Sequence, residues 1–214
     1  MKTLSVPFIE GLEKYDFNAL ALKMETEAAK AFIDTVCWPD EYPYRPDAAV
    51  SIARSATHIV IWYRVNGMDL RAKAMEDNGP VWEDSCCEFF VGDPSDGTYY
   101  NFEMNCIGTL LAAKRKSRTD FMFFSREELD QVIRHSSLER KEYGTEGELA
   151  GWQTAICIPF GLIGMDGGNL PENIRANFYK CGDKTAHPHF LSWNPVEVSH
   201  PDFHRPEFFG LLEF

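Results

Sequence analysis

The sequence lacks the short motifs that identify several enzyme classes. It contains no G-x-S-x-G nucleophile elbow, no phosphate-binding Walker loop and no dinucleotide-binding glycine fingerprint. None of its six cysteines forms a C-x-x-C pair, which argues against a thioredoxin-like redox site and against a zinc knuckle. Because Cys106 and Cys157 lie in apolar, strand-like stretches, we expect reduced thiols in the core rather than a disulfide framework.

Long hydrophobic stretches are also missing. The longest apolar run covers residues 59–63, far fewer than the roughly 20 residues that a membrane-spanning helix needs. The first ten residues have neither the apolar centre of a signal peptide nor a small-residue cleavage site. We therefore expect a location inside the cell, unless a leader precedes this chain.

Positive charge is scarce relative to negative charge. The 214 residues include 21 Lys and Arg against 33 Asp and Glu, which gives a formal net charge of -12. Such a chain repels phosphate backbones and anionic lipids, so nucleic-acid and membrane partners are disfavoured. A neutral mono- or oligosaccharide is indifferent to this charge. Aromatic residues make up 14% of the chain, and aromatic rings commonly hold neutral sugars.

Helical periodicity is scarce as well. Ser125 precedes an acidic turn and predicts a helix over residues 125–134, and residues 160–165 fit a single turn. Elsewhere apolar residues recur at every second position, which is typical of strands. The predicted strands cover residues 48–54, 57–65, 69–74, 85–91, 99–106, 109–114, 137–143, 151–158, 174–180 and 208–213.

Many short strands with Gly- and Pro-rich turns predict an all-β fold, an antiparallel β-sandwich with one or two short helices. Asn66 and Gly67 form the strongest hairpin signal, between the second and third predicted strands. We expect one domain over residues 1–214, in which residues 1–46 wrap one edge of the sandwich. The sequence gives no indication of oligomeric state.

Two neighbouring strands carry polar groups on one face. Alternation places Glu88 on the same side as Cys86 and Phe90, opposite Cys87 and Phe89. In the next strand Asn101, Glu103 and Asn105 share a face, while Phe102, Met104 and Cys106 point to the core. Carboxylates and amides of this kind match sugar hydroxyls. From periodicity alone, a solvated sheet face remains the simpler interpretation.

The order and spacing of several sequence blocks are more informative than the periodicity. The blocks are WEDSxxExF at 82–90, YxFExNxxG at 100–108, Trp152 with IPF at 158–160, RANFY at 175–179, SWNP at 192–195 and FHxPxxFGxLxF at 203–214. Together they resemble the family 9 carbohydrate-binding modules, more closely the family-9-like, DOMON-like domains that occur as small stand-alone proteins. The resemblance covers the chain from about residue 51 to its last residue.

The resemblance implies an immunoglobulin- or jelly-roll-like sandwich that binds sugar without catalysis, holding it between two tryptophan rings. Trp82 matches one ring, and Trp193 is the candidate for the other. Glu88 stands where the family has a hydroxyl-binding acid, and Asn105, Arg115 and Lys180 are further candidates at nearby strand ends. Family members often hold structural calcium, for which Asp93 and Asp96 in the turn at 92–97 are the local candidates; no other cofactor is expected.

Other chemistries remain open from the residues alone. A glycosidase would use Glu88 with a second carboxylate such as Glu103, and a sandwich whose site has degenerated would only have a structural or interaction role. Haem ligation by Met68 or Met104 lacks a paired histidine. His200 and His204 have a spacing that zinc allows, but Pro201 prevents the regular helix that would bring both rings together.

Overall fold

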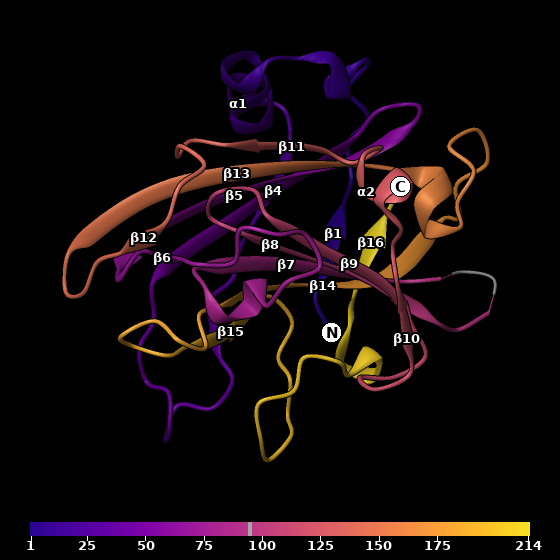
Figure 1. Ribbon diagram of the computed structural model, residues 1–214. Coiled ribbons are helices and arrows are strands. Elements are labelled where there is room, and N and C mark those ends of the chain that lie inside the picture. Colours follow the sequence, from indigo (N-terminus) through magenta and orange to yellow (C-terminus); the bar gives the residue numbers. More distant parts are fainter. Residues whose placement is uncertain (94–95) are drawn as a thin grey trace.

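Two β-sheets packed face to face form the body of the protein (Figure 1). The computed structural model describes residues 1–93 and 96–214, so the predicted turn at 92–97 is described only in part. Over these residues the larger sheet has nine strands, seven of them in the order β1-β16-β14-β7-β8-β9-β10, with β15 pairing to β14 and β3 pairing to β15. The smaller sheet has the order β11-β13-β5-β4-β2, and β6 and β12 form a separate ribbon. The predicted antiparallel β-sandwich is confirmed, with one parallel pair, β1 with β16.

The strands of the larger sheet are β1 (Thr3–Ser5), β3 (Thr35–Val36), β7 (Cys86–Gly92), β8 (Tyr99–Asn105), β9 (Leu110–Arg115), β10 (Phe121–Phe123), β14 (Asn173–Cys181), β15 (Phe190–Ser192) and β16 (Gly210–Glu213). The smaller sheet and the ribbon contain β2 (Ala29–Phe32), β4 (Asp47–Arg54), β5 (His58–Met68), β6 (Arg71–Ala72), β11 (Ile133–Ser136), β12 (Tyr143–Gly144) and β13 (Leu149–Pro159). The helical elements are α1 (Phe17–Thr26), α2 (Arg126–Leu129) and the 3-10 turns η1 (Leu12–Lys14), η2 (Val81–Glu83), η3 (Phe160–Ile163) and η4 (Pro206–Phe208).

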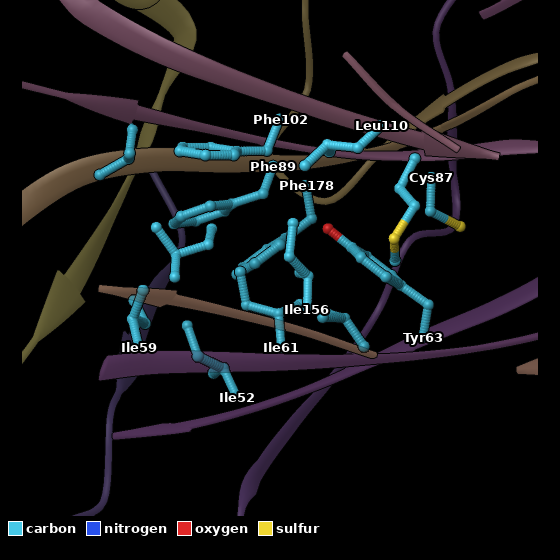
Figure 2. Packing of buried hydrophobic residues seen from close by; sticks show 14 of the residues in the cluster. Ile52, Ile59, Ile61, Tyr63, Cys87, Phe89, Phe102, Leu110, Ile156 and Phe178 are labelled. Atoms are coloured by element: carbon cyan, nitrogen blue, oxygen red, sulfur yellow. The ribbon is translucent and has the colours of Figure 1, made fainter. Parts of the chain in front are cut away.

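The main core fills the space between the two sheets. Figure 2 shows Ile61 of β5 and Ile156 of β13 facing Phe89 and Phe178 of the larger sheet. The two phenylalanine rings stack with centroids 5.2 Å apart. Each such side chain contributes roughly 1.5–3 kcal/mol when it is fully buried, so the alternation of the strands is fixed by this layer. Trp152 and Phe160 lie in the same core, as expected.

The N-terminal segment adds to both sheets. Within residues 1–46, β1 extends the larger sheet beside β16, and β2 extends the smaller sheet beside β4. The sequence interpretation missed α1, which packs on the outer face of the smaller sheet through buried Leu20 and Met24 (Figure 1). Asp16 caps this helix by accepting a hydrogen bond from the backbone N–H of Ala19 (2.9 Å). This N-cap residue, followed by apolar residues four positions apart, could have indicated the helix from the sequence.

The hairpin predicted at Asn66 and Gly67 was wrong. Strand β5 continues through both residues to Met68, because β13 and β4 pair with it on either side. Gly67 serves a close approach instead: a Cβ there would stand 2.7 Å from the hydroxyl oxygen of Tyr44. The chain turns at the following residue, Asp69, which has φ 69°.

Two further element predictions need correction. The strand expected at 137–143 does not form; the chain there links β11 to the two-residue β12. The helix expected over 125–134 is shorter, since α2 ends at Leu129 and β11 begins at Ile133. Its N-terminal capping box, formed by Ser125 and Glu128, is present, and the turn predicted at 160–165 corresponds to η3.

All six cysteines are free thiols, five of them buried and Cys37 half-buried. This agrees with the expectation of core thiols. In the described part of the chain, no helix is long and apolar enough to cross a membrane.

Gly210, at the start of β16, allows the close packing of Trp193 against the sheet. A Cβ at this position would stand 2.4 Å from an indole carbon of Trp193 and 2.9 Å from the carbonyl oxygen of Lys2. We expect Gly210→Ala to lower the free energy of unfolding by about 1–3 kcal/mol through overpacking. Gly161→Ala, where the added Cβ meets nothing within 4 Å, is the control and should change it by less than about 0.5 kcal/mol. Equal midpoints in urea for the two variants would contradict this account.

Candidate functional site

A cavity of about 480 Å³ lies on the outer face of the larger sheet, on the side away from the smaller sheet. This volume is within the range of small-molecule binding sites. Its floor comes from β7, β8, β9 and the end of β14, and its walls come from η2, β10, β15 and the loop before η4. The lining residues are Tyr42, Trp82, Glu88, Glu103, Leu111, Arg115, Arg118, Phe121, Phe123, Cys181, Asp183, Phe190, Pro201, Asp202, Phe203 and His204.

Strand register assembles the floor. Glu88 of β7 stands directly opposite Glu103 of β8, which in turn is paired with Leu111 of β9. Because side chains alternate along each strand, these three residues share the outer face while Phe89 and Phe102 enter the core. The predicted polar face of β7 and β8 is therefore confirmed for both acids.

The two acids of the floor are buried without an ion-pair partner among the described residues. The Cys181 thiol donates a hydrogen bond to Glu88 (3.0 Å), and the Asn101 amide donates one to Glu103 (2.8 Å). Burial, together with the neighbouring Glu103 carboxyl, raises the pKa of Glu88 well above its ordinary value. Burial also raises the pKa of Glu103, to about 7. A protonated carboxyl both donates and accepts hydrogen bonds, which a carboxylate cannot do.

Arg115 supplies the cationic part of the floor. Its Nε donates to the Asn101 side-chain oxygen (2.6 Å), one Nη donates to the carbonyl oxygen of Arg118 (2.9 Å), and the guanidinium lies 4.2 Å from the ring centroid of Phe121. Burial lowers the pKa of Arg115, which nevertheless stays charged. His204 lies beside it, and burial together with the positive charges of Arg115 and Arg118 lowers its pKa to about 3. The imidazole is therefore neutral and pairs with the Tyr99 hydroxyl (3.1 Å).

Trp82 lines the cavity from η2 and is 38% exposed. Its carbonyl oxygen accepts a hydrogen bond from the backbone N–H of Asp183 (3.1 Å), which joins η2 to the end of β14. The buried Asp84 carboxylate anchors the other side of η2 by accepting from the backbone N–H groups of Lys73 (3.0 Å) and Ala74 (2.9 Å). Trp82 is thus an exposed ring on a fixed turn.

Two aromatic groups form other walls of the cavity. Phe121 and Phe123 come from the edge strand β10 and are 41% and 42% exposed. Tyr42, Phe190 and Phe203 pack against one another on the side of β15, with ring centroids 4.8 and 6.1 Å apart in successive pairs. A site with apolar ring faces and a few convergent polar groups can hold a small polar molecule that has apolar faces.

Comparison with known proteins identifies the family. The model of carbohydrate-binding family 9 matches residues 18–214, which is most of the chain. The chain belongs to carbohydrate-binding family 9. The modules of this family bind carbohydrate without catalysis, so the glycosidase alternative is set aside.

Solved structures agree with the family 9 assignment. A Bacteroides uniformis protein described as a candidate carbohydrate-binding protein is similar at a TM-score of 0.90 and 37% identity, covering 100% of this chain and 99% of its own. Two structures of a family 9 module from Caldicellulosiruptor kristjanssonii, in complex with cellotriose and with glucose, have TM-scores of 0.57 and 0.51. Each is 10% identical, covers 99% of this chain and 93% or 95% of its own, and supports the fold alone. A search of curated protein sequences found no significant match.

Of the six family 9 candidates predicted from the sequence, Trp82, Glu88 and Arg115 are brought together in the cavity. Trp193 is not: its side chain is 3% exposed and packs in the core against Phe178, with ring centroids 5.6 Å apart. The assignment of Trp193 as a second sandwiching ring was therefore wrong. Its position in the chain matched a family pattern, but it lies on the core side of the sheet.

Asn105 and Lys180 are also structural. Asn105 is on the predicted face but is fully buried, and its amide donates to Asp84 and to the carbonyl oxygen of Ala74 (both 3.0 Å). Lys180 points to the opposite face of β14 from the cavity floor, where its ammonium contacts His189 Nε2 (2.7 Å) and the Cys181 carbonyl oxygen. Neither side chain lines the cavity, because each is held by a partner elsewhere.

The predicted calcium ligands have a different partner. Lys114 Nζ lies 2.8 Å from a carboxylate oxygen of Asp93 and 3.0 Å from one of Asp96. The Lys114 ammonium group therefore lies between the two carboxylates. Residues 94 and 95 of the same turn lie outside the described residues. The calcium expectation stays a prediction that nothing here tests.

His200 and His204, considered for zinc, and the neighbouring His187 and His189 do not share a common partner among the described residues. His187 contacts the Asp69 carboxylate, His189 contacts Lys180, and His204 contacts Tyr99, while His200 is exposed. Met104, considered for haem, lies in the core between the sheets, and Met68 ends β5.

Sequence reasoning did not identify several lining residues of the cavity as site candidates. Phe121 and Phe123 alternate around Met122 in a short stretch that was not predicted as a strand. Asp183 lies two residues after the end of β14, and burial with the nearby Glu83 raises its pKa to about 6. The two phenylalanines at alternate positions in 121–123 could have indicated the strand β10. No local feature of the sequence marks Asp183 as a site residue.

The anchoring of Asp84 gives a prediction that separates structure from binding. Asn105→Ala removes the side-chain amide that donates to Asp84 and to the Ala74 carbonyl oxygen and that accepts from the backbone N–H of Thr109, so we expect the free energy of unfolding to fall by about 1–3 kcal/mol. Asn173→Ala at the exposed start of β14 is the control and should have an effect below about 0.5 kcal/mol. Urea denaturation measures both. An Asn105→Ala variant that is as stable as the wild type but does not bind the ligand would contradict this account and indicate that Asn105 binds the ligand.

Proposed function

We propose that the cavity binds a unit of a neutral mono- or oligosaccharide, with Trp82 as a stacking surface and the carboxyls of Glu88 and Glu103 reading the hydroxyls. The observation that carries this proposal is a partly exposed tryptophan beside two buried acids that have no ion-pair partner among the described residues, in one cavity of a family 9 chain. The glucose and cellotriose complexes of the Caldicellulosiruptor modules make glucose and short β-glucans the first ligands to test.

The aromatic walls suit the apolar faces of a pyranose ring. The backbone of Trp82 is held by the hydrogen bond that its carbonyl oxygen accepts from Asp183, so the turn that carries the ring loses little freedom when a ligand stacks on it. Since Trp193 is buried, we propose that the second apolar surface is formed by Phe121 and Phe123 of β10. Both rings line the same cavity and are about two-fifths exposed.

The floor suits uncharged hydroxyls. Glu88 and Glu103, with pKa values raised by burial, offer a donor and an acceptor each when protonated, and Arg115 offers donors only. Hydroxyl groups also donate and accept, so this set can satisfy several hydroxyls at once. The overall charge of -12 adds no attraction for such a ligand, in keeping with a neutral sugar.

Trp82→Ala tests the stacking surface. We expect the affinity for a sugar that binds the wild type to fall at least about ten-fold, because 1.4 kcal/mol of stacking and burial is removed. Isothermal titration with glucose, cellotriose and other neutral oligosaccharides measures it. Phe32→Ala, which removes an exposed aromatic ring outside the cavity, is the control and should bind like the wild type. Failure of every neutral sugar to bind the wild type would favour a degenerate site.

The β10 surface has a control within the same strand. Phe121→Ala and Phe123→Ala should each weaken sugar binding several-fold through loss of apolar contact, roughly 1 kcal/mol apiece. Met122 lies between them, is 73% exposed and does not line the cavity, so Met122→Ala should leave the affinity unchanged. Unaltered affinity in both phenylalanine variants would place the second ring elsewhere.

A further inference from the structure

Three metal-ligating groups converge at the edge of the cavity floor. Within the described residues, one ligand atom each from Cys86, Glu88 and Cys181 lies within 4.8 Å of the other two, and all three residues are buried. Strand register causes this convergence. Cys86 of β7 is the direct cross-strand partner of Cys181 of β14, and Glu88 follows two positions later on the same face.

The separations are close to those of a tetrahedral site. Zinc–sulfur bonds of about 2.3 Å and zinc–oxygen bonds of about 2.0–2.2 Å place neighbouring ligand atoms roughly 3.6–3.8 Å apart. The Cys181 sulfur already lies 3.0 Å from a carboxylate oxygen of Glu88. The pair would therefore have to move apart by about 0.6 Å to admit an ion. Two sulfur ligands favour soft divalent cations over calcium or magnesium.

The surroundings give an ion both a route and a charge balance. Glu88 and Cys181 line the cavity, so an ion can arrive from solvent through it. Two thiolates and a carboxylate carry three negative charges, against two positive charges on the ion. The Lys180 ammonium, on the other face of β14, contributes a positive charge that acts on Cys86.

We propose that Cys86, Glu88 and Cys181 bind one zinc-like divalent cation, with the fourth coordination position open to the cavity. On binding, each thiol and the Glu88 carboxyl, where it is protonated, give their protons to the buffer, and no electron is transferred. The open position is the arrangement of zinc sites that accept water or a ligand oxygen. The metal site shares Glu88 with the proposed sugar site, whereas Trp82 belongs to the sugar site alone.

The experiment uses the full chain, reduced and freed of metal, titrated with Zn²⁺ and with Cd²⁺. We expect one ion per chain by equilibrium dialysis, and a thiolate-to-cadmium charge-transfer band in the ultraviolet. Cys86→Ala and Cys181→Ala should each weaken binding by more than about 100-fold, beyond the cost of losing an outer-shell partner. Cys87→Ala is the matched control, because Cys87 neighbours Cys86 but points into the core, and it should bind like the wild type.

Absence of a bound ion in the wild type would overturn the proposal, as would equal loss in Cys87→Ala or full binding in Cys86→Ala. If the alanine variants do not fold, ¹¹³Cd NMR of the wild type decides: a shift typical of two sulfur ligands supports the site, and one typical of oxygen ligands overturns it. Two variants distinguish this proposal from the sugar proposal. Trp82→Ala should keep the metal, and metal-free Cys86→Ala should bind sugar with the wild-type affinity.

Discussion

The position of β7 between β14 and β8 is the constraint on which the rest of the molecule depends. Its alternation sends Phe89 into the layer between the sheets and Glu88 to the opposite side. A slip of one residue would exchange these two side chains and put a carboxyl into the core. The stacking of Phe89 on Phe178 therefore determines where the acids of the cavity lie. One face of β7 packs in the core, and the other face lines the cavity.

The cavity combines buried charge-bearing groups with very few ion pairs. Glu88 and Glu103 are satisfied by a thiol and an amide rather than by a cation, and His204 is kept neutral by burial and nearby positive charge. Removing acids from water without a counter-charge is costly in their ionised form. The floor is therefore suited to neutral groups or to a cation.

Pattern reasoning succeeded where burial repeats along one strand. The faces of β7 and β8, and the capping box of α2, follow from local spacing, and the sandwich follows from the sum of such strands. Pattern reasoning failed where a residue distant in sequence determines the local structure. Gly67 looks like a turn residue, but the pairing of β5 with β4 and β13 keeps it inside a strand. Trp193 matches a binding motif, yet Gly210 makes room for it in the core, and no local feature of the sequence shows this. The second wall of the cavity escaped prediction because β10 is only three residues long.

The shortness of β10 has an energetic consequence. This strand is hydrogen-bonded through three residues to β9 alone and carries two of the aromatic rings of the cavity. An edge strand with so few bonds separates from its sheet at a lower free energy than the central strands do. A ligand that touches these rings gives up part of its binding energy to hold the strand in place, and in return it makes the edge of the sheet more rigid. Substitutions in the loops that flank β10 would then alter affinity through the entropy of this wall, without touching the ligand.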